Sequence, residues 1–252
     1  MRRKVLRNFL IALIVSLLIT LVGTALWIGN PAQAMPEATA ALESDNAVTV
    51  EQTPWLSFTA SSRDATTGLI FYPGGLVDPR AYAPTMQAIA AQGFLAVIVP
   101  MPLNLAVFGA NQADEVIAAH PEIAHWAIGG HSLGGSMAAR YADEHSDTID
   151  ALLLLASYPA GDNDLSTAAM RVVSISGTLD GLATPEKIEA SRALLPLSTL
   201  FIPIEGGNHA QFGWYGTQNG DNAASITREA QQAIVIQASI DLLTAISGAQ
   251  SS

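Results

Sequence analysis

Cysteine is absent from the 252 residues of this chain, which excludes disulfide bonds, a catalytic thiol and thiolate metal ligands. Charged residues are scarce as well, at 13%, whereas 50% of the residues are apolar; this balance is typical of a folded domain. The motifs H-E-x-x-H, the EF-hand loop and the phosphate-binding G-x-x-x-x-G-K-[ST] are also missing. The sequence therefore predicts one sizeable core, no metal ion and no cofactor.

Basic residues are the scarcer charged type, with 11 Lys and Arg against 22 Asp and Glu. Four of the 11 lie within the first seven residues, so the rest of the chain carries seven basic and 22 acidic side chains, a formal charge of −15. Such a surface repels nucleic acids and anionic lipids. We therefore expect no nucleic-acid partner, and we interpret the acidic excess mainly as a contribution to solubility.

The one long apolar run, residues 9–28, contains no charge and has the length of a helix that crosses a bilayer. Basic residues stand at positions 2, 3, 4 and 7, and the next is Arg63, so the positive-inside rule leaves the N-terminus in the cytoplasm and exports the rest. A cleavable signal peptide is the alternative, because Ala32-Gln33-Ala34 resembles a cleavage site. The run is longer than a usual signal-peptide core, so we expect residues 1–29 to be an uncleaved single-pass anchor; cleavage after Ala34 would instead give a secreted protein.

Strand-like and helix-like segments alternate along the rest of the chain. Residues 30–47, with two prolines and several alanines, are expected to be a flexible linker, and residues 48–248 to be one domain. Apolar runs predict strands at 48–50, 55–59, 68–72, 94–99, 126–128, 149–155, 171–175 and 199–204. Helical spacing predicts helices at 79–92, 111–119, 132–145 and 184–195, and an amphipathic one at 227–246. The fold class is therefore α/β, a mostly parallel sheet with helices on both faces, whose ligands bind beyond the carboxyl ends of the strands.

One short stretch, Gly130-His131-Ser132-Leu133-Gly134, fits the pattern G-x-S-x-G between a predicted strand and a predicted helix. A serine on such a strained strand-to-helix turn exposes its hydroxyl, and the turn leaves no room for side chains two residues away on either side. The following helix directs its positive end at the serine. We interpret Ser132 as a nucleophile; a buried serine in an ordinary glycine-rich turn is the alternative.

A serine nucleophile needs a histidine as general base, and the chain has five. Four are disfavoured by position: His120 at a helix end, His125 at the wrong end of the strand, His131 inside the turn, and His145 about 20 Å along the helix. His209 remains, in the glycine-rich loop after the last strand. A loop histidine bonded only to the backbone would be the plain alternative.

The acid that orients the base should lie between Ser132 and His209 in the chain. Asp180 follows the strand at 171–175 on a loop, where its carboxylate can accept the second ring N–H of His209. Asp162 and Asp164, after the preceding strand, are alternatives, and an Asp-Gly turn is the purely structural interpretation. Glu205 lies closer to His209 in sequence, and we expect it only to support that residue.

An oxyanion requires two backbone donors. The N–H of Leu133, at the start of the helix after Ser132, is the first. The loop after residues 68–72, Pro73-Gly74-Gly75-Leu76, should supply the second. We expect this donor to be the N–H of Gly75, with Leu76 as the alternative, although a simple Pro-Gly turn would have the same sequence.

Four segments together resemble the α/β-hydrolase superfamily, most of all its small dienelactone-hydrolase-like members without a large lid. They are Tyr72-Pro73-Gly74-Gly75, Gly129-Gly130-His131-Ser132-Leu133-Gly134-Gly135, Gly177-Thr178-Leu179-Asp180 and Gly206-Gly207-Asn208-His209. The resemblance covers about residues 48–248. It implies an α/β-hydrolase fold without a cap domain, Ser132 as nucleophile, His209 as base and Asp180 as its partner.

Two features depart from many relatives. Pro73 stands where they have the histidine of an H-G motif, and only about 15 residues separate the strand ending at Leu155 from Arg171, where lipases insert a lid. We therefore expect an open site covered by loops 101–109 and 210–225. The apolar residues of these loops either line an acyl pocket or pack beneath the loops: Leu103, Leu105, Val107, Phe108, Phe212, Trp214 and Tyr215.

The expected function is that of a membrane-anchored serine hydrolase outside the cytoplasm, acting on small carboxylic esters through an acyl-enzyme. An amidase or acyltransferase with the same three residues is one alternative. A binding module without activity on the same scaffold is another. The expected partners are a small ester or amide and, through the N-terminal helix, a membrane.

Overall fold

The computed structural model describes residues 8–9, 13–17, 20, 23 and 29–248. It divides into two units, residues 1–31 and 32–252. In the first unit, residues 13–17 are helical. Within the described ranges, no helix combines the length and the apolar character needed to span a bilayer. Most of the predicted anchor at 9–28 falls outside those ranges, so the anchor stays a prediction.

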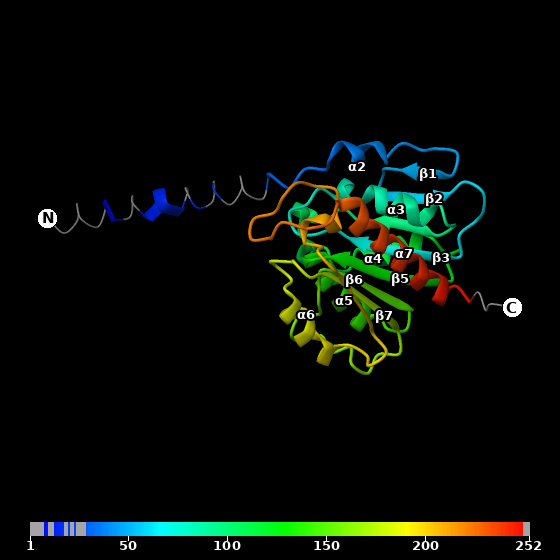
Figure 1. Cartoon of the computed structure of the whole chain (residues 1–252). Coiled ribbons are helices and arrows are strands. Elements are labelled where there is room, and N and C mark those ends of the chain that lie inside the picture. Colours follow the sequence, from blue (N-terminus) through cyan, green and yellow to red (C-terminus); the bar gives the residue numbers. More distant parts are fainter. Residues whose placement is uncertain (1–7, 10–12, 18–19, 21–22, 24–28, 249–252) are drawn as a thin grey trace. The chain divides into compact units, whose positions relative to one another are not determined.

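An eight-stranded sheet organises the second unit (Figure 1), in the order β1-β2-β4-β3-β5-β6-β7-β8. Its strands are β1 (Val48–Glu51), β2 (Leu56–Ala60), β3 (Thr67–Tyr72), β4 (Leu95–Ile98), β5 (His125–His131), β6 (Ala151–Leu155), β7 (Arg171–Gly177) and β8 (Leu200–Ile204). The pairs β1–β2 and β2–β4 are antiparallel and all others are parallel. The predicted mostly parallel sheet is confirmed.

Helices cover both faces of the sheet. Successive residues of a strand point to opposite faces, so one strand contributes side chains to two cores. On one face, Leu69 and Phe71 of β3 belong to a core shared with α3 (Ala83–Ala90) and α7 (Arg228–Ile246). On the other, Ile70 and Tyr72 belong to a core shared with α4 (Ala113–Ala119) and α5 (Leu133–Glu144). A continuous apolar sequence such as that of β3 therefore serves two cores at once.

Two predicted helices are divided in the structure, and some short turns were not predicted. The helix expected at 79–92 is a 3₁₀ turn, η1 (Pro79–Tyr82), followed by α3, and that expected at 184–195 is α6 (Pro185–Ser191) followed by η4 (Arg192–Leu194). The loops contain three further 3₁₀ turns, η2 (Pro102–Asn104), η3 (Ala106–Phe108) and η5 (Ala210–Phe212). The rest of the predicted elements differ from the observed ones mainly at their ends.

The segment expected to be a flexible linker, residues 30–47, instead packs on the domain from residue 32 onward. It contains the short helix α2 (Pro36–Ala40), whose Ala38 is fully buried. The N–H of Ala32 donates to the carbonyl of Leu76 at 2.7 Å, and the N–H of Met35 donates to that of Trp214 at 2.8 Å. Hydrogen bonds between the backbone and distant loops cannot be recognised from local composition. The proline and alanine content of residues 30–47 therefore indicated a flexible linker.

Helix α7 is not amphipathic in the simple sense expected. Gln231 and Gln232 are buried, whereas Ile234 is 40% exposed. The reason is that the buried amides bond to loops: the N–H of Asn208 donates to Gln231 Oε1 at 3.0 Å, and Gln231 Nε2 donates to the Asn208 carbonyl at 2.8 Å. This helix therefore holds the loop that leads into His209.

Candidate active site

Ser132 occupies a strained turn between β5 and α5. Its backbone has φ 53° and ψ −124°, a combination that costs on the order of 1–3 kcal/mol for a residue other than glycine. Strand β6 and the residues after it hold this turn: the Ser132 N–H donates to the Leu155 carbonyl at 3.0 Å, and the Ser157 hydroxyl donates to the Ser132 carbonyl at 2.7 Å. Two hydrogen bonds, one to the end of β6 and one from the loop that follows it, thus maintain the strain.

The glycines around Ser132 are required by close backbone contacts. A Cβ on Gly134 would lie 2.1 Å from the Tyr72 carbonyl oxygen, and one on Gly130 would lie 2.5 Å from the Gly134 carbonyl carbon. Helix α5 therefore approaches β3 and β5 more closely than any side chain permits. This confirms the physical reason given for the G-x-S-x-G spacing.

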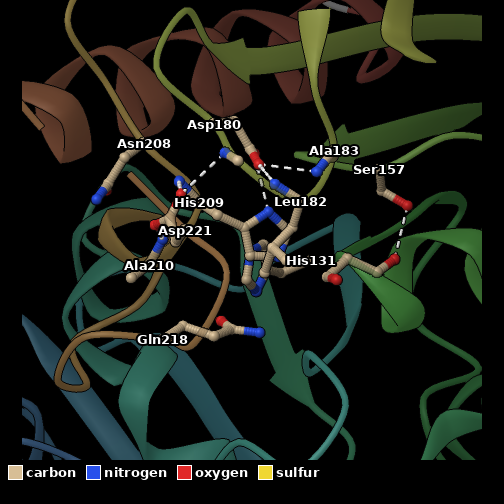
Figure 2. A network of polar contacts seen from close by, with 12 residues as sticks. His131, Ser157, Asp180, Leu182, Ala183, Asn208, His209, Ala210, Gln218 and Asp221 are labelled. Carbon is tan, nitrogen blue, oxygen red and sulfur yellow. Dashed lines mark hydrogen bonds and ion pairs between the residues drawn. The ribbon is translucent and has the colours of Figure 1, made fainter. Parts of the chain in front are cut away.

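Asp180 and His209 form a buried hydrogen-bonded pair beyond the carboxyl ends of β7 and β8 (Figure 2). Asp180 Oδ2 lies 2.8 Å from His209 Nδ1, and these residues are only 2% and 1% exposed. Asp180 Oδ1 accepts the N–H groups of Leu182 and Ala183, both at 2.8 Å. With this carboxylate as its acceptor, His209 carries a proton on Nδ1 and presents the lone pair of Nε2.

Ser132 and His209 line one cavity of about 260 Å³. The other residues of its wall are Leu133, Ser136, Ala156, Ser157, Tyr158, Leu182 and Ala183. Within residues 29–248, His209 Nε2 has no hydrogen-bond partner, the Ser132 hydroxyl included. In enzymes without substrate such catalytic bonds are often long or poorly aligned.

The other candidate histidines have partners elsewhere. His120 pairs with Glu122 at 3.0 Å and His125 with Asp150 at 3.3 Å. The ring of His145 stacks on Tyr141 with centroids 4.0 Å apart. Their exclusion as bases for Ser132 is therefore consistent with the geometry.

Of the alternative acids, none meets His209 in the described structure. Asp162 and Asp164 are exposed, and Asp164 accepts the N–H of Ser166 instead. Glu205, expected to support His209, is exposed and makes no hydrogen bond to the described residues. The supporting carboxylate is instead that of Asp221, 12 residues after His209, which accepts the His209 backbone N–H at 3.2 Å. Nothing in the local sequence of Asp221 marks it, because its partners lie far away along the chain.

His131, disfavoured as a base because of its place in the turn, contacts His209 directly. Its ring centroid lies 4.5 Å from that of His209. Its Nδ1 lies 2.8 Å from the Tyr82 hydroxyl, which itself accepts the N–H of Gly74 at 3.0 Å. Burial raises the pKa of Tyr82, so this hydroxyl keeps its proton and can donate it to His131. Burial, and next the positive charge of a protonated His209, hold the pKa of His131 well below its usual value.

The two candidates for the second oxyanion donor differ in what their N–H groups bind. The N–H of Leu76 donates to the Asn104 carbonyl at 2.8 Å, so Leu76 is excluded as the alternative. Gly75 lies against Leu133, since a Cβ placed on it would be 3.0 Å from Leu133 Cδ2. The N–H of Leu133 opens helix α5, where the first N–H groups have no acceptor within the helix. The adjacent Gly75 and Leu133 thus suit a pair of donors.

None of the seven apolar loop residues considered for an acyl pocket lines the cavity beside Ser132. Phe212 and Tyr215 are fully buried, and their rings lie 5.8 and 6.2 Å from that of His131. By contrast, Leu103 and Phe108 are 57% and 60% exposed. The expectation of packing holds for Phe212 and Tyr215, which are buried against His131.

Comparison with known proteins agrees with this architecture. Residues 68–233 match the family model described as the alpha/beta hydrolase family. No curated protein matches the sequence.

Among solved structures, a thermophilic esterase from Thermogutta terrifontis is similar with a TM-score of 0.59 and 14% identity, covering 82% of this chain and 96% of that one. Est1E from Butyrivibrio proteoclasticus, solved with ferulic acid bound, has a TM-score of 0.58 and 11% identity, covering 77% and 98%. A CIB-like hydrolase from Thermoplasma acidophilum gives 0.58 and 11%, covering 77% and 99%. At these identities the likeness shows a shared fold.

The close contact at Gly134 predicts that Gly134→Ala disrupts the turn. The added methyl would overlap the Tyr72 carbonyl, so we expect a loss of about 3 kcal/mol or more in the free energy of unfolding. Gly161→Ala is the matched control, because nothing lies within 4 Å of its Cβ, and it should change stability by less than about 0.5 kcal/mol. Urea unfolding followed by circular dichroism measures both; equal stabilities would contradict the packing described.

Proposed function

The chain belongs to the alpha/beta hydrolase family, and from this premise we propose that it is a serine hydrolase of carboxylic esters. Ser132 is the nucleophile, His209 the general base and Asp180 the residue that orients the base. The observation that carries the proposal is the buried Asp180–His209 pair at 2.8 Å, whose imidazole lines the same cavity as the strained Ser132. A base held in one tautomer beside an exposed hydroxyl is what nucleophilic catalysis by serine requires.

The reaction proceeds through an acyl-enzyme. His209 Nε2 takes the Ser132 proton as Oγ attacks the ester carbonyl carbon, and the N–H groups of Leu133 and Gly75 stabilise the resulting oxyanion. The alcohol then leaves with the proton that His209 returns. Water enters, gives its proton to His209 and attacks the acyl carbon, after which the acid departs and Ser132 regains its proton.

Charge in the site suits this cycle. His209 becomes positive in each half of the reaction, and the Asp180 carboxylate at Nδ1 compensates that charge. The neighbouring His131 has a strongly lowered pKa and stays neutral, so it does not oppose the charge on His209. The amino end of α5 adds a favourable dipole where the oxyanion forms.

The size of the cavity favours a small acyl group. Its volume of about 260 Å³ lies below the ~300–1,000 Å³ of pockets for drug-sized ligands. The side chains of Tyr158 and Leu182 belong to its wall. We therefore propose short-chain esters as substrates.

Anchorage in a membrane, with the domain outside the cytoplasm, is a further part of the proposal. It is supported by the uncharged residues 9–28 and by the basic residues that precede them. Ala32 supports an uncleaved chain: its N–H donates to the Leu76 carbonyl and its carbonyl accepts the N–H of Asp78 at 2.9 Å. Cleavage after Ala34 would remove both bonds from the loop that carries Gly75.

Ser132→Ala should lower turnover of p-nitrophenyl acetate by at least about 10³-fold and abolish labelling by a fluorophosphonate, because no other group then attacks the carbonyl. Ser198→Ala, at an exposed serine outside the site, is the control and should keep both activities. Circular dichroism checks that each variant is folded. Wild-type turnover by the folded Ser132→Ala protein would disprove the assignment.

We expect kcat/KM to fall at least about tenfold from p-nitrophenyl butyrate to p-nitrophenyl decanoate, since a cavity of about 260 Å³ buries little of a long chain. Leu182→Ala removes part of the wall and should raise the decanoate-to-butyrate ratio. Leu197→Ala, at a fully exposed leucine away from the cavity, should leave the ratio unchanged. A ratio that does not respond to Leu182→Ala would show that the acyl group lies elsewhere.

The full chain expressed in bacteria should remain with the membrane fraction after alkaline carbonate washing, because an apolar helix is held by the bilayer core rather than by charge. N-terminal sequencing should find the original start of the chain. Release by carbonate, together with a new N-terminus at Met35, would instead establish cleavage and secretion.

A further inference from the structure

The carboxylate of Asp221 accepts an unusual set of hydrogen bonds. All four donors are backbone N–H groups: Gly181 at 3.1 Å, His209 at 3.2 Å and Asn222 at 2.9 Å to Oδ1, and Ala210 at 2.9 Å to Oδ2. Within the described residues no cation hydrogen-bonds to this carboxylate. It is therefore satisfied by backbone dipoles drawn from three separate places in the chain.

Two of these places carry the proposed catalytic pair. Gly181 directly follows Asp180, while His209 supplies one donor itself and Ala210 supplies the next. Figure 2 shows Asp221 beside His209 and Ala210, on the side away from Ser157. One carboxylate thus bridges the loop of the acid and the loop of the base.

The two loops are also joined nearer the strands, before either catalytic side chain. There the Leu179 N–H donates to the Gly207 carbonyl at 2.9 Å, and the Gly206 N–H donates to the Thr178 hydroxyl at 2.9 Å. Asp221 joins the same two loops further along the chain, through the N–H groups of Gly181, His209 and Ala210. The loop of Asp221 fits tightly, because a Cβ on Gly181 would lie 2.3 Å from the Gly220 carbonyl oxygen. Asp180 and His209 are therefore held between two sets of bonds.

We propose that Asp221 is a positioning residue that sets the alignment of His209 with Asp180, an inference that rests on the proposed hydrolase function. It also acts as the N-terminal acceptor of the 3₁₀ turn η5, which begins directly after His209. Charged acceptors form stronger hydrogen bonds to N–H groups than neutral ones do. An amide in place of the carboxylate would turn one acceptor into a donor that faces backbone N–H groups.

Asp221 acts on the base and not on the substrate. It is absent from the residues that line the cavity beside Ser132, whereas His209 belongs to that wall. Loss of the carboxylate should therefore lower kcat while KM stays nearly constant. A shift of about 1 Å in a catalytic group can cost about 10²-fold in rate.

A double-mutant cycle tests the proposal. In the full-length protein, Asp221→Asn should lower kcat by about 10- to 100-fold and change KM by less than about twofold. In an Asp180→Asn background, where the pair is already broken, the same change should lower kcat by less than about threefold. Glu205→Gln is the matched control, because this carboxylate precedes His209 by four residues, is exposed and binds no described residue; its kcat should be unchanged.

A purely structural role would give a different result, namely the same loss of kcat in both backgrounds, and would overturn the proposal, as would an unchanged kcat. If Asp221→Asn does not fold, Gly220→Ala replaces it: at φ 86° an alanine strains the loop of Asp221 and leaves the carboxylate intact. It should show the same dependence on Asp180. Failure of the hydrolase proposal is separately visible, because Ser132→Ala would then keep its turnover.

Discussion

The site depends on the strained backbone of Ser132. Its positive φ is maintained by two hydrogen bonds: the Ser132 N–H donates to the Leu155 carbonyl at the end of β6, and the Ser157 hydroxyl donates to the Ser132 carbonyl. The neighbouring glycines also let α5 approach the sheet closely. The strain has a chemical consequence. It presents the hydroxyl at the carboxyl edge of the sheet and aims the amino end of α5 at the same point, so in the proposed mechanism one turn supplies both the nucleophile and the stabilisation of the oxyanion.

The other two proposed catalytic side chains, Asp180 and His209, lie on loops that are held in part by polar bonds. Gln231 of α7 binds the backbone of Asn208, and Asp221 binds the backbone of His209, the next residue. Buried polar groups of this kind are costly when left unpaired, so each bond specifies one arrangement of the loop. The buried amides of α7 and the carboxylate of Asp221 in the loop after η5 are thus parts of the same support.

Local pattern was enough to predict the succession of strands and helices along the chain and the turn at Ser132, and the resemblance of four segments predicted the family. It also selected Asp180 and His209, because in a parallel sheet the residues that follow strands share one edge, and few histidines satisfied that condition. The observed pair at 2.8 Å agrees with this reasoning. Three features could not be predicted from local pattern, because each depends on a partner far away along the chain. They are the packing of residues 32–42, the buried amides of α7, and the hydrogen bond from the Leu76 N–H to the Asn104 carbonyl.

Glu205 and Asp221 show why distance along the sequence did not identify the carboxylate that contacts the backbone of His209. Glu205 lies four residues before His209, but its side chain points into solvent from the end of an edge strand. Asp221 is three times as distant in sequence, yet a loop that turns back over η5 brings its carboxylate onto the His209 backbone. A supporting carboxylate must reach N–H groups that have no other acceptor, and the start of a 3₁₀ turn offers such groups whatever the chain distance. Unsatisfied donors therefore predict the supporting residue better than neighbouring positions in the sequence do.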